Sequence, residues 1–296
     1  MPAASFWARA ICKKPSGAMG SLLSDQQCVT VSAILDRYER DCLPKLAPRT
    51  QKDYVHHLRK LRREFGDRIA DELRPRDFGP FLQVKHGQTS RVRQLAVLSS
   101  AFTEAVSSWY WIERNCLKDV KRPRSKPRDR LISATEFEGV REMAPERIGL
   151  AMQLALLTGQ RQGDILRFKW TDIRSGALHV RQSKTGKRLA IELNPELKRV
   201  LGKCSKLQNR IKCDYVLPTR MGEPYTPEGF RAAWQRVMRA WMARGNENFH
   251  FHDIRALAAT KCETPEIAMR LLGHSTLAMT MRVYRRGTER VKALSA

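Results

Sequence analysis

Residues 168–193 read FKWTDIRSGALHVRQSKTGKRLAIEL, and this stretch decides the fold of the second half of the chain. Apolar and β-branched residues favour short strands at residues 168–173, 177–181 and 188–193. Ser175-Gly176 and Thr185-Gly186 separate these stretches with residues that are typical of tight turns. The pattern therefore predicts a small three-stranded antiparallel sheet.

The segments on either side of this stretch have helical periodicity. Ser133 or Thr135 is placed to cap a helix, and residues 147–158 form a strongly apolar helix that ends at Thr158-Gly159. Thr226-Pro227 gives a cap with proline at the first helical position. Further helices are predicted over residues 252–262, 265–272 and 276–284. Residues 131–296 thus predict a mixed α/β domain.

The first half of the chain predicts a smaller, all-helical domain over residues 25–120. Thr30 and Thr50 are placed to cap two helices, and a longer helix is predicted over residues 89–111. Residues 121–130, KRPRSKPRDR, hold six basic residues and two prolines, which is typical of a linker. The fold class is therefore mainly α with two domains, after a disordered or unassigned leader over residues 1–24.

Composition points to a polyanionic partner. The chain has 55 Lys and Arg against 30 Asp and Glu, a net charge of +25, and 42% hydrophobic residues, which excludes global disorder. A basic structural protein is the alternative, but such chains are usually shorter and poorer in Trp and Leu. Seven scattered cysteines without a C-x-x-C pair indicate reduced thiols in a cytosolic protein. The sequence has no apolar run of membrane-spanning length.

Basic residues cluster where contact with a phosphate backbone is expected. We predict DNA contacts from one face of the helix after Thr50 and from the linker: Lys52, Arg59, Lys60, Arg62, Arg63, Lys121, Arg122 and Arg124. The alternatives are a solvated helix face and a soluble tether.

Six residues in the second half of the chain suit chemistry at a phosphodiester. The candidate catalytic residues are Arg161, Lys184, His252, Arg255, His274 and Tyr284. Arginine forks neutralise a pentavalent phosphate, lysine and histidine move protons, and a phenol attacks phosphorus when a cationic pocket and a base assist it. Asp164 is placed to orient the guanidinium of Arg161 from one helical turn away. The set predicts no metal and no other cofactor.

A metal site is the rival interpretation of one segment. His250 and His252 alternate around Phe251, so a strand would place both imidazoles on one side. No third ligand has convincing spacing, and the segment runs directly into a helix, which favours the metal-free interpretation.

Five motifs occur in a fixed order, and together they carry a family resemblance. They are TGQRQGD at 158–164, SKTGK at 183–187, HDIR at 252–255, LLGH at 271–274, and the late Tyr284. The chain resembles the tyrosine recombinase (phage integrase) family, clearly over residues 145–290 and in outline over 25–120, the core-binding domain. Tyr284 lies one residue further from His274 than the family pattern, and Val283 falls where the tyrosine usually aligns.

The resemblance implies a role for each candidate residue. Arg161 and Arg255 would clamp the scissile phosphate, and Lys184 would protonate the leaving 5′ oxygen. His252, as base, and His274 would assist proton transfer. Tyr284 would attack the phosphorus and form a 3′-phosphotyrosyl link, which conserves the energy of the broken bond.

The resemblance also implies partners. Such enzymes form C-shaped clamps on double-stranded DNA and act as homotetramers on paired sites, sometimes with accessory DNA-bending proteins, and are monomers when free. We expect a protein of the bacterial cytoplasm, without membrane contact, that integrates or excises a phage or other mobile element. The alternatives are a type IB-like topoisomerase and a catalytically dead DNA-binding regulator. Larger relatives carry an N-terminal arm-binding module, for which residues 1–24 are too short.

Overall fold

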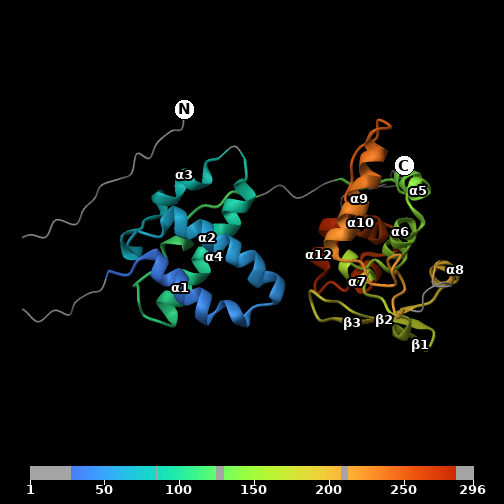
Figure 1. Cartoon of the computed structure of the whole chain (residues 1–296), viewed down its shortest axis with the longest axis horizontal. Helices are drawn as coiled ribbons and strands as arrows, with labels where there is room; N and C mark the ends of the chain where they lie inside the picture. Colours follow the sequence, from blue (N-terminus) through green and yellow to red (C-terminus); the bar gives the residue numbers. More distant parts are fainter. Residues whose placement is uncertain (1–27, 85, 125–129, 208–212, 285–296) are drawn as a thin grey trace, which may run out of the picture. The chain divides into compact units, whose positions relative to one another are not determined.

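The computed structural model describes residues 28–84, 86–124, 130–207 and 213–284, and it describes residues 283 and 284 by their backbone only. The chain divides into two compact units, Met1–Lys126 and Pro127–Ala296 (Figure 1). The leader expected over residues 1–24 and residues 125–129 of the expected linker lie outside the described residues.

Unit 1 is helical throughout its described part. Its helices are α1 (Val31–Asp41), α2 (Pro48–Phe65), α3 (Gly79–Leu82) and α4 (Gln88–Ser107). Short 3-10 turns join or follow them at Leu43–Lys45, Ala70–Glu72, Pro75–Phe78 and Cys116–Lys118. The three long helices pack against one another around fully buried side chains that include Ile34, Leu58, Leu98 and Phe102.

Threonine caps were predicted for two helix starts in unit 1, and the structure bears out one of them. Thr30 caps α1 by accepting a hydrogen bond from Ala33 N at 3.2 Å, as predicted. The predicted cap at Thr50 is wrong, because α2 already begins at Pro48. Proline suits the first helical position because its φ is fixed and its missing N–H would have no helical partner there.

Unit 2 contains a three-stranded antiparallel sheet. Its strands are β1 (Ile173–Arg174), β2 (Ala177–Arg181) and β3 (Arg188–Glu192), in the order β1-β2-β3. The predicted bounds of the middle strand are confirmed. The predicted first strand over 168–173 is wrong for all but its last residue. Residues 170–172 form a 3-10 turn, and Trp170 N donates to Asp214 O at 2.9 Å instead of to the sheet.

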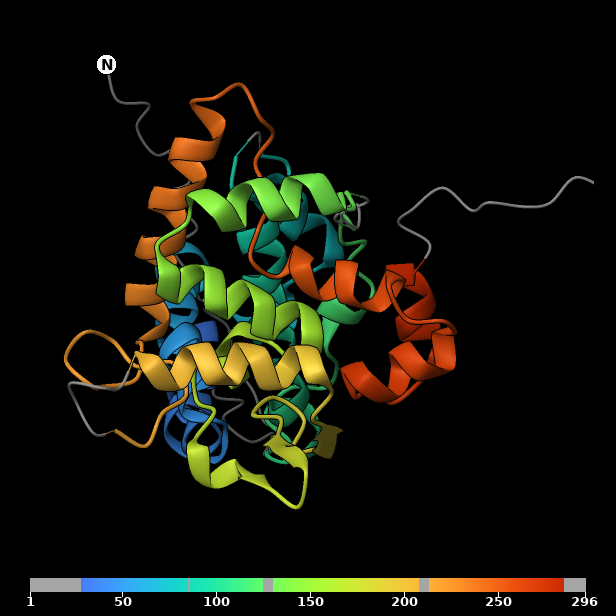
Figure 2. The same ribbon diagram turned by 90° about the vertical axis from the view of Figure 1, so that its right-hand side faces the viewer.

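Helices form most of the remaining described part of unit 2. They are α5 (Ala134–Met143), α6 (Glu146–Thr158), α7 (Gln162–Ile165), α8 (Pro195–Lys206), α9 (Pro227–Met242), α10 (Asp253–Thr260), α11 (Pro265–Leu272) and α12 (Leu277–Tyr284). In Figure 2, α5, α6 and α8 lie one below another, with α9 at one end of this layer and α10 to α12 at the other. The buried α6 is therefore the central helix of the unit.

Sequence signals fix most of these helix starts. Ser133 and Glu136 form the reciprocal capping box of α5, and Thr226 accepts from Gly229 N at 3.0 Å at the start of α9. Helix α8 was not predicted individually, although Asn194 caps it by accepting from Leu197 N at 2.8 Å. No helix in the described part of the chain is long and apolar enough to span a membrane. None of the six described cysteines forms a disulfide bond.

Candidate active site

A buried arginine joins three helices of unit 2. Arg255 lies on α10 and is 5% exposed. Its guanidinium donates to Gly159 O, in the turn that ends α6, and to Leu272 O at 2.6 Å, at the end of α11. Two of its five N–H groups are therefore fixed by backbone carbonyls, and this sets the direction of the rest.

The two turns that meet Arg255 depend on glycine. Gly159 and Gly273 end their helices with φ of 63° and 66°, the left-handed region that glycine adopts without strain. A Cβ on Gly273 would lie 2.7 Å from the side-chain nitrogen of Gln182, and one on Gly159 would lie 3.0 Å from Leu272. Close backbone approach thus adds a second requirement for glycine at both positions.

A buried glutamine connects the second arginine to the same turns. Arg161 precedes α7 and donates from Nη1 to Gln182 Oε1 at 2.9 Å. Gln182 is fully buried, and its Nε2 donates to Gln160 Oε1 at 2.8 Å and to Leu272 O at 2.9 Å. Thr185 donates to the same Oε1 at 2.9 Å. Gln182 therefore holds the sheet, the start of α7 and the end of α11 in one network.

Asp164 has a different partner from the one predicted. Its buried Oδ1 accepts from Ser183 N at 2.9 Å and from Arg167 at 3.1 Å, while its buried Oδ2 has no hydrogen-bond partner. The hydrogen bond that orients Arg161 comes from Gln182 instead. Asp164 anchors the turn after β2.

That turn carries two lysines. Lys184 is exposed on it, and the hydrogen bonds from Gln182 N to Lys187 O at 2.9 Å and from Gly186 N to Gln182 O at 2.8 Å close it. Lys187, which was not predicted, donates from Nζ to His274 O at 3.3 Å. The turn thus places the ammonium group of Lys187, in addition to that of Lys184, beside the candidate site.

His274 is half-buried and lies near Arg255 and Arg161. Its Nδ1 lies 3.0 Å from the hydroxyl of the fully buried Thr280. Burial, together with the positive charges of Arg255, Arg161, Lys187 and His252, lowers the pKa of His274 to about 4. The imidazole is therefore neutral at pH 7 and presents its other ring nitrogen, Nε2, as a hydrogen-bonding group.

Arg161 and Arg255 have no counterion among the described residues. Burial and the nearby Arg161 lower the pKa of Arg255 to about 10, and Asp164 partly opposes this shift. Arg255 remains a cation at pH 7. Within the described residues, neither arginine forms an ion pair. A buried cation without an ion-pair partner is costly, so this arrangement favours binding of an anion.

The remaining two candidates lie on neighbouring elements. His252 is exposed at the start of α10 and is one of the charges that lower the pKa of His274. Tyr284 is the last residue of α12, which packs against α10 and α11, and its side chain lies outside the described residues. The structure therefore gathers Arg161, Arg255, His252 and His274, with Lys184 on the adjoining turn.

Sequence reasoning missed the residues that support this site. Along β2, Leu178 and Val180 point inward and are buried, and the same alternation predicts an inward position for residue 182. A glutamine at an inward position is a signal for a buried polar network. The partners Gln160 and Thr280 gave no comparable signal, because their burial depends on the packing of α11 and α12.

The predicted DNA contacts differ in their exposure. Lys52, Arg59, Lys60 and Arg63 are exposed on α2, as are Lys121 and Arg124 near the end of unit 1. Arg62 instead forms ion pairs with Asp36, at 2.7 Å, and with Glu39 on α1. Arg122 donates to Leu117 O at 3.2 Å. In the described part of the chain, no three His, Cys, Asp or Glu side chains are grouped as metal ligands.

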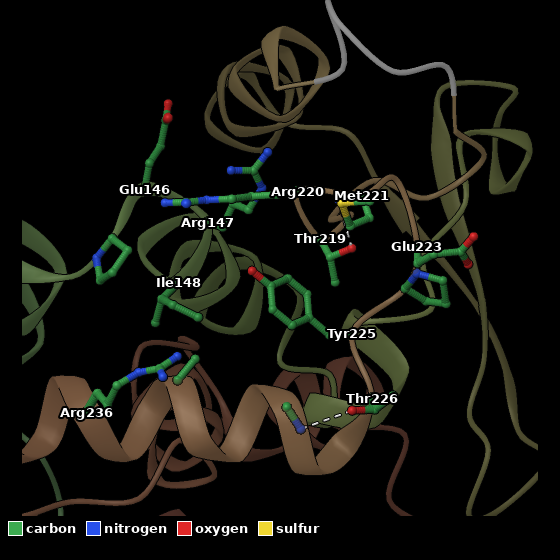
Figure 3. Close-up of a pocket in the computed structure, with 14 residues that line it drawn as sticks. Glu146, Arg147, Ile148, Thr219, Arg220, Met221, Glu223, Tyr225, Thr226 and Arg236 are labelled. Carbon is green, nitrogen blue, oxygen red and sulfur yellow. Dashed lines mark hydrogen bonds between the residues drawn. The ribbon is translucent and has the colours of Figure 1, made fainter.

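A separate cavity lies at the far end of α6 (Figure 3). It has a volume of about 850 Å³, and its lining includes Arg147, Arg220, Tyr225 and Arg236. Burial raises the pKa of Tyr225, and the charges of Arg147 and Arg220 oppose this. Because α6 starts at Glu146 and Gly159 follows its end, the helix separates this cavity from the arginine pair by about 20 Å.

Known proteins are similar to this chain in sequence. The model of the phage integrase family matches residues 126–290. The integrase of Escherichia phage HK022 is 29% identical over 272 residues, which cover 86% of this chain and 75% of that protein. The integrase of Escherichia phage lambda is 28% identical over 275 residues, which cover 87% and 76%.

Solved structures share the fold. A lambda integrase dimer bound to a COC′ core site superimposes with a TM-score of 0.78 at 28% identity, covering 90% of this chain and 99% of that one. A lambda integrase tetramer bound to a Holliday junction gives a TM-score of 0.78 at 28% identity, covering 90% and 81%. The ordered motifs, the arginine pair with its link through Gln182 to the turn after β2, and these similarities agree: the chain belongs to the phage integrase family.

Proposed function

We propose that the chain is a site-specific DNA recombinase that cuts and rejoins DNA through a 3′-phosphotyrosine intermediate. The observation that carries this proposal is the pair Arg161 and Arg255, which has no counterion among the described residues, beside the neutral His274. A phosphodiester supplies the missing negative charge, and its charge grows on the equatorial oxygens during attack. Preorganised guanidinium donors stabilise that state more than the ground state.

The roles of the site residues follow from their positions. Arg255 and Arg161 bind the non-bridging oxygens, because backbone carbonyls and Gln182 already fix the orientation of both. His274 donates a hydrogen bond from Nε2 to the phosphate when the anion's charge raises its pKa. His252, exposed beside this group, removes the proton of the attacking phenol.

Tyr284 is the nucleophile of this mechanism. Its oxygen attacks phosphorus, the bond to the 5′ oxygen breaks, and Lys184 delivers a proton to that leaving oxygen. A 5′ hydroxyl from the partner strand then attacks the phosphotyrosine and restores the phenol. Each step exchanges one phosphoester for another, so we propose that the reaction needs no metal and no nucleotide.

The partners are proposed from the relatives. Lambda integrase is bound to a core site as a dimer and to a Holliday junction as a tetramer. We infer double-stranded DNA sites and a homotetramer for this chain, which would act on DNA in the bacterial cytoplasm in integration or excision. Residues 25–120 would be the core-binding domain and 131–296 the catalytic domain. The exposed basic residues of α2 would contact phosphates, without Arg62, which α1 engages.

Covalent capture tests the proposal. The chain is first used to select preferred duplexes from a randomised library, and nicked forms of the selected duplex are then incubated with it in EDTA. We expect a covalent complex that survives denaturation, and its loss in Tyr284→Phe with DNA binding retained. Cleavage only with added magnesium, or a covalent complex in Tyr284→Phe, would contradict the mechanism. Relaxation of supercoiled circles that lack the selected site would instead favour a topoisomerase.

A further inference from the structure

The cavity at the far end of α6 is lined by three guanidinium groups from three separate elements. Arg147 lies in the first turn of α6, Arg220 lies in the segment before α9, and Arg236 lies on α9. None of the three forms an ion pair with a residue that the structure describes. The cavity therefore presents three positive charges that lack an anionic partner in the described part of the chain.

Two carboxylates also line the cavity, but they do not pair with these arginines. In Figure 3 the side chains of Glu146 and Glu223 extend away from the cavity, and neither forms an ion pair with a described residue. Like charges that share one space repel each other, and an anion placed between them turns this repulsion into attraction. The cavity is therefore suited to an anionic ligand.

A tight hairpin between α8 and α9 carries one of the three guanidinium groups. Pro218 and Pro224 pair across the base of this hairpin, and Thr219 N donates to Glu223 O at 2.7 Å. Arg147 Nε donates to Pro218 O at 3.1 Å and so ties the start of α6 to the hairpin. No hydrogen bond among the described residues uses the two terminal nitrogens of Arg147, which remain as donors for a ligand.

The floor of the cavity is apolar. Ile148 is only 2% exposed, and the ring of the half-buried Tyr225 meets Phe230 edge to face, with ring centroids 5.7 Å apart. Figure 3 shows Ile148 and Tyr225 between the guanidinium groups on the two sides of the cavity. An apolar floor between guanidinium groups suits a molecule that carries a planar ring as well as negative charge.

The size and position of the cavity indicate a small molecule. Its volume of about 850 Å³ lies within the range of small-molecule sites, roughly 300–1,000 Å³. In a DNA duplex the bases are paired, so only phosphates could reach the cavity, and the apolar floor would stay without a contact. The length of α6 separates the cavity from Arg255, so a phosphate bound at the candidate active site does not reach it.

We propose that this cavity binds a nucleoside polyphosphate, with its phosphates between Arg147 and Arg220 and its base against Ile148 and the ring of Tyr225. Arg236 adds a third positive charge from the other side of the cavity. Guanidinium groups donate paired hydrogen bonds to phosphate oxygens, and aromatic rings stack on bases of any sequence. The nucleotide is a bound ligand and not a reactant, so this inference does not depend on the recombinase proposal.

Calorimetric titration of the full-length chain with ATP and with GTP tests this site. The buffer holds no divalent cation and about 150 mM salt, which screens contacts with exposed charges. We expect at least one of the two nucleotides to bind with a dissociation constant below about 1 mM. Tripolyphosphate, which has no base, should bind roughly 5- to 150-fold more weakly than that nucleotide.

Four variants locate the bound nucleotide. Arg147→Ala and Arg220→Ala should each weaken its binding roughly 10- to 150-fold, because each loses a hydrogen-bonded charge contact. Arg239→Ala is the matched control, since Arg239 is exposed on α9 but does not line the cavity, and it should bind as the wild type does. Arg161→Ala, in the candidate active site, should also bind as the wild type does. Thermal unfolding midpoints within about 2 °C of the wild-type value show that each variant is folded.

Four outcomes would overturn the assignment. The first is that neither nucleotide binds the wild-type chain, and the second is that tripolyphosphate binds as tightly as the nucleotides, which would show a patch for anions alone. If Arg161→Ala abolishes binding while Arg147→Ala and Arg220→Ala do not, the nucleotide occupies the candidate active site. If the selected duplex displaces the nucleotide from Arg161→Ala, and Arg147→Ala weakens duplex binding, the cavity is a DNA contact. Because none of these measurements involves cleavage, each result is distinct from the outcome of covalent capture.

Discussion

Replacement of Gln182 by alanine tests the polar network behind the candidate active site. The substitution removes two acceptor contacts, from Arg161 and Thr185, and two donor contacts, to Gln160 and Leu272. Arg161 and Thr185 can turn to water because they are at least partly exposed, and Leu272 O keeps its hydrogen bond from Arg255.

The largest loss of stability comes from Gln160, which is 1% exposed, because its Oε1 would no longer accept a hydrogen bond from the Gln182 side chain. An unsatisfied buried acceptor costs about 1–3 kcal/mol, and the space left by the truncated side chain adds to this. We expect Gln182→Ala to lower the free energy of unfolding by about 2–4 kcal/mol, which leaves a typical domain folded. Urea denaturation followed by circular dichroism measures this.

The same variant should slow cleavage through Arg161. Without its hydrogen bond to Gln182, the guanidinium is no longer held toward the phosphate, and we expect a loss of about 10- to 100-fold in the single-turnover cleavage rate. Gln182→Glu keeps the contact as an ion pair, so it should weaken DNA binding by competing with the phosphate. Arg181→Ala, at the exposed neighbouring position, is the matched control. Wild-type stability and cleavage in Gln182→Ala would refute the role of this network.

Three further predictions concern neighbouring residues. Lys184→Ala should lower the cleavage rate at least 100-fold, and the rate should recover on a duplex in which sulfur, a better leaving group, replaces the 5′ oxygen. Lys187→Ala should lower the rate less and show no such recovery. The reverse pattern would make Lys187 the acid. Because the folded-state pKa of His274 is lowered from 6.5 to about 4, its contribution to stability is complete above pH 6.5 and is lost as pH falls toward 4. Urea denaturation across this range should show that the free energy of unfolding of His274→Gln depends less steeply on pH than that of the wild type. An unchanged pH dependence would contradict the shift. Gly273→Ala should destabilise unit 2 by about 2 kcal/mol or more, since the φ of 66° and the contact with the Gln182 side chain both disfavour a Cβ. Gly202→Ala is the control and should not destabilise the unit, because Gly202 is exposed on a helix with open space around it.

Local chemistry explains which parts of the fold could be predicted. The caps at Thr30, Ser133 and Thr226 are confirmed, because a capping hydrogen bond involves only residues three apart. The middle strand was predicted with its bounds for a similar reason, since alternation and two glycine turns specify it. The first strand failed because its start pairs with residues 214–216, far along the chain, which no local pattern encodes.

The candidate site likewise combines features that the sequence determines with features that depend on tertiary packing. The sequence by itself determined which chemical groups the chain carries and their order: two arginines, a lysine, two histidines and a tyrosine. Only the tertiary structure decided that Gln182, not Asp164, orients Arg161, that Arg255 is buried between two glycine turns, and that α9 runs beside His252. The physical reason is that burial and hydrogen-bond partners arise from segments packed at long sequence separation. They fix the direction and pKa of a side chain, whereas its chemical identity is already present in the chain.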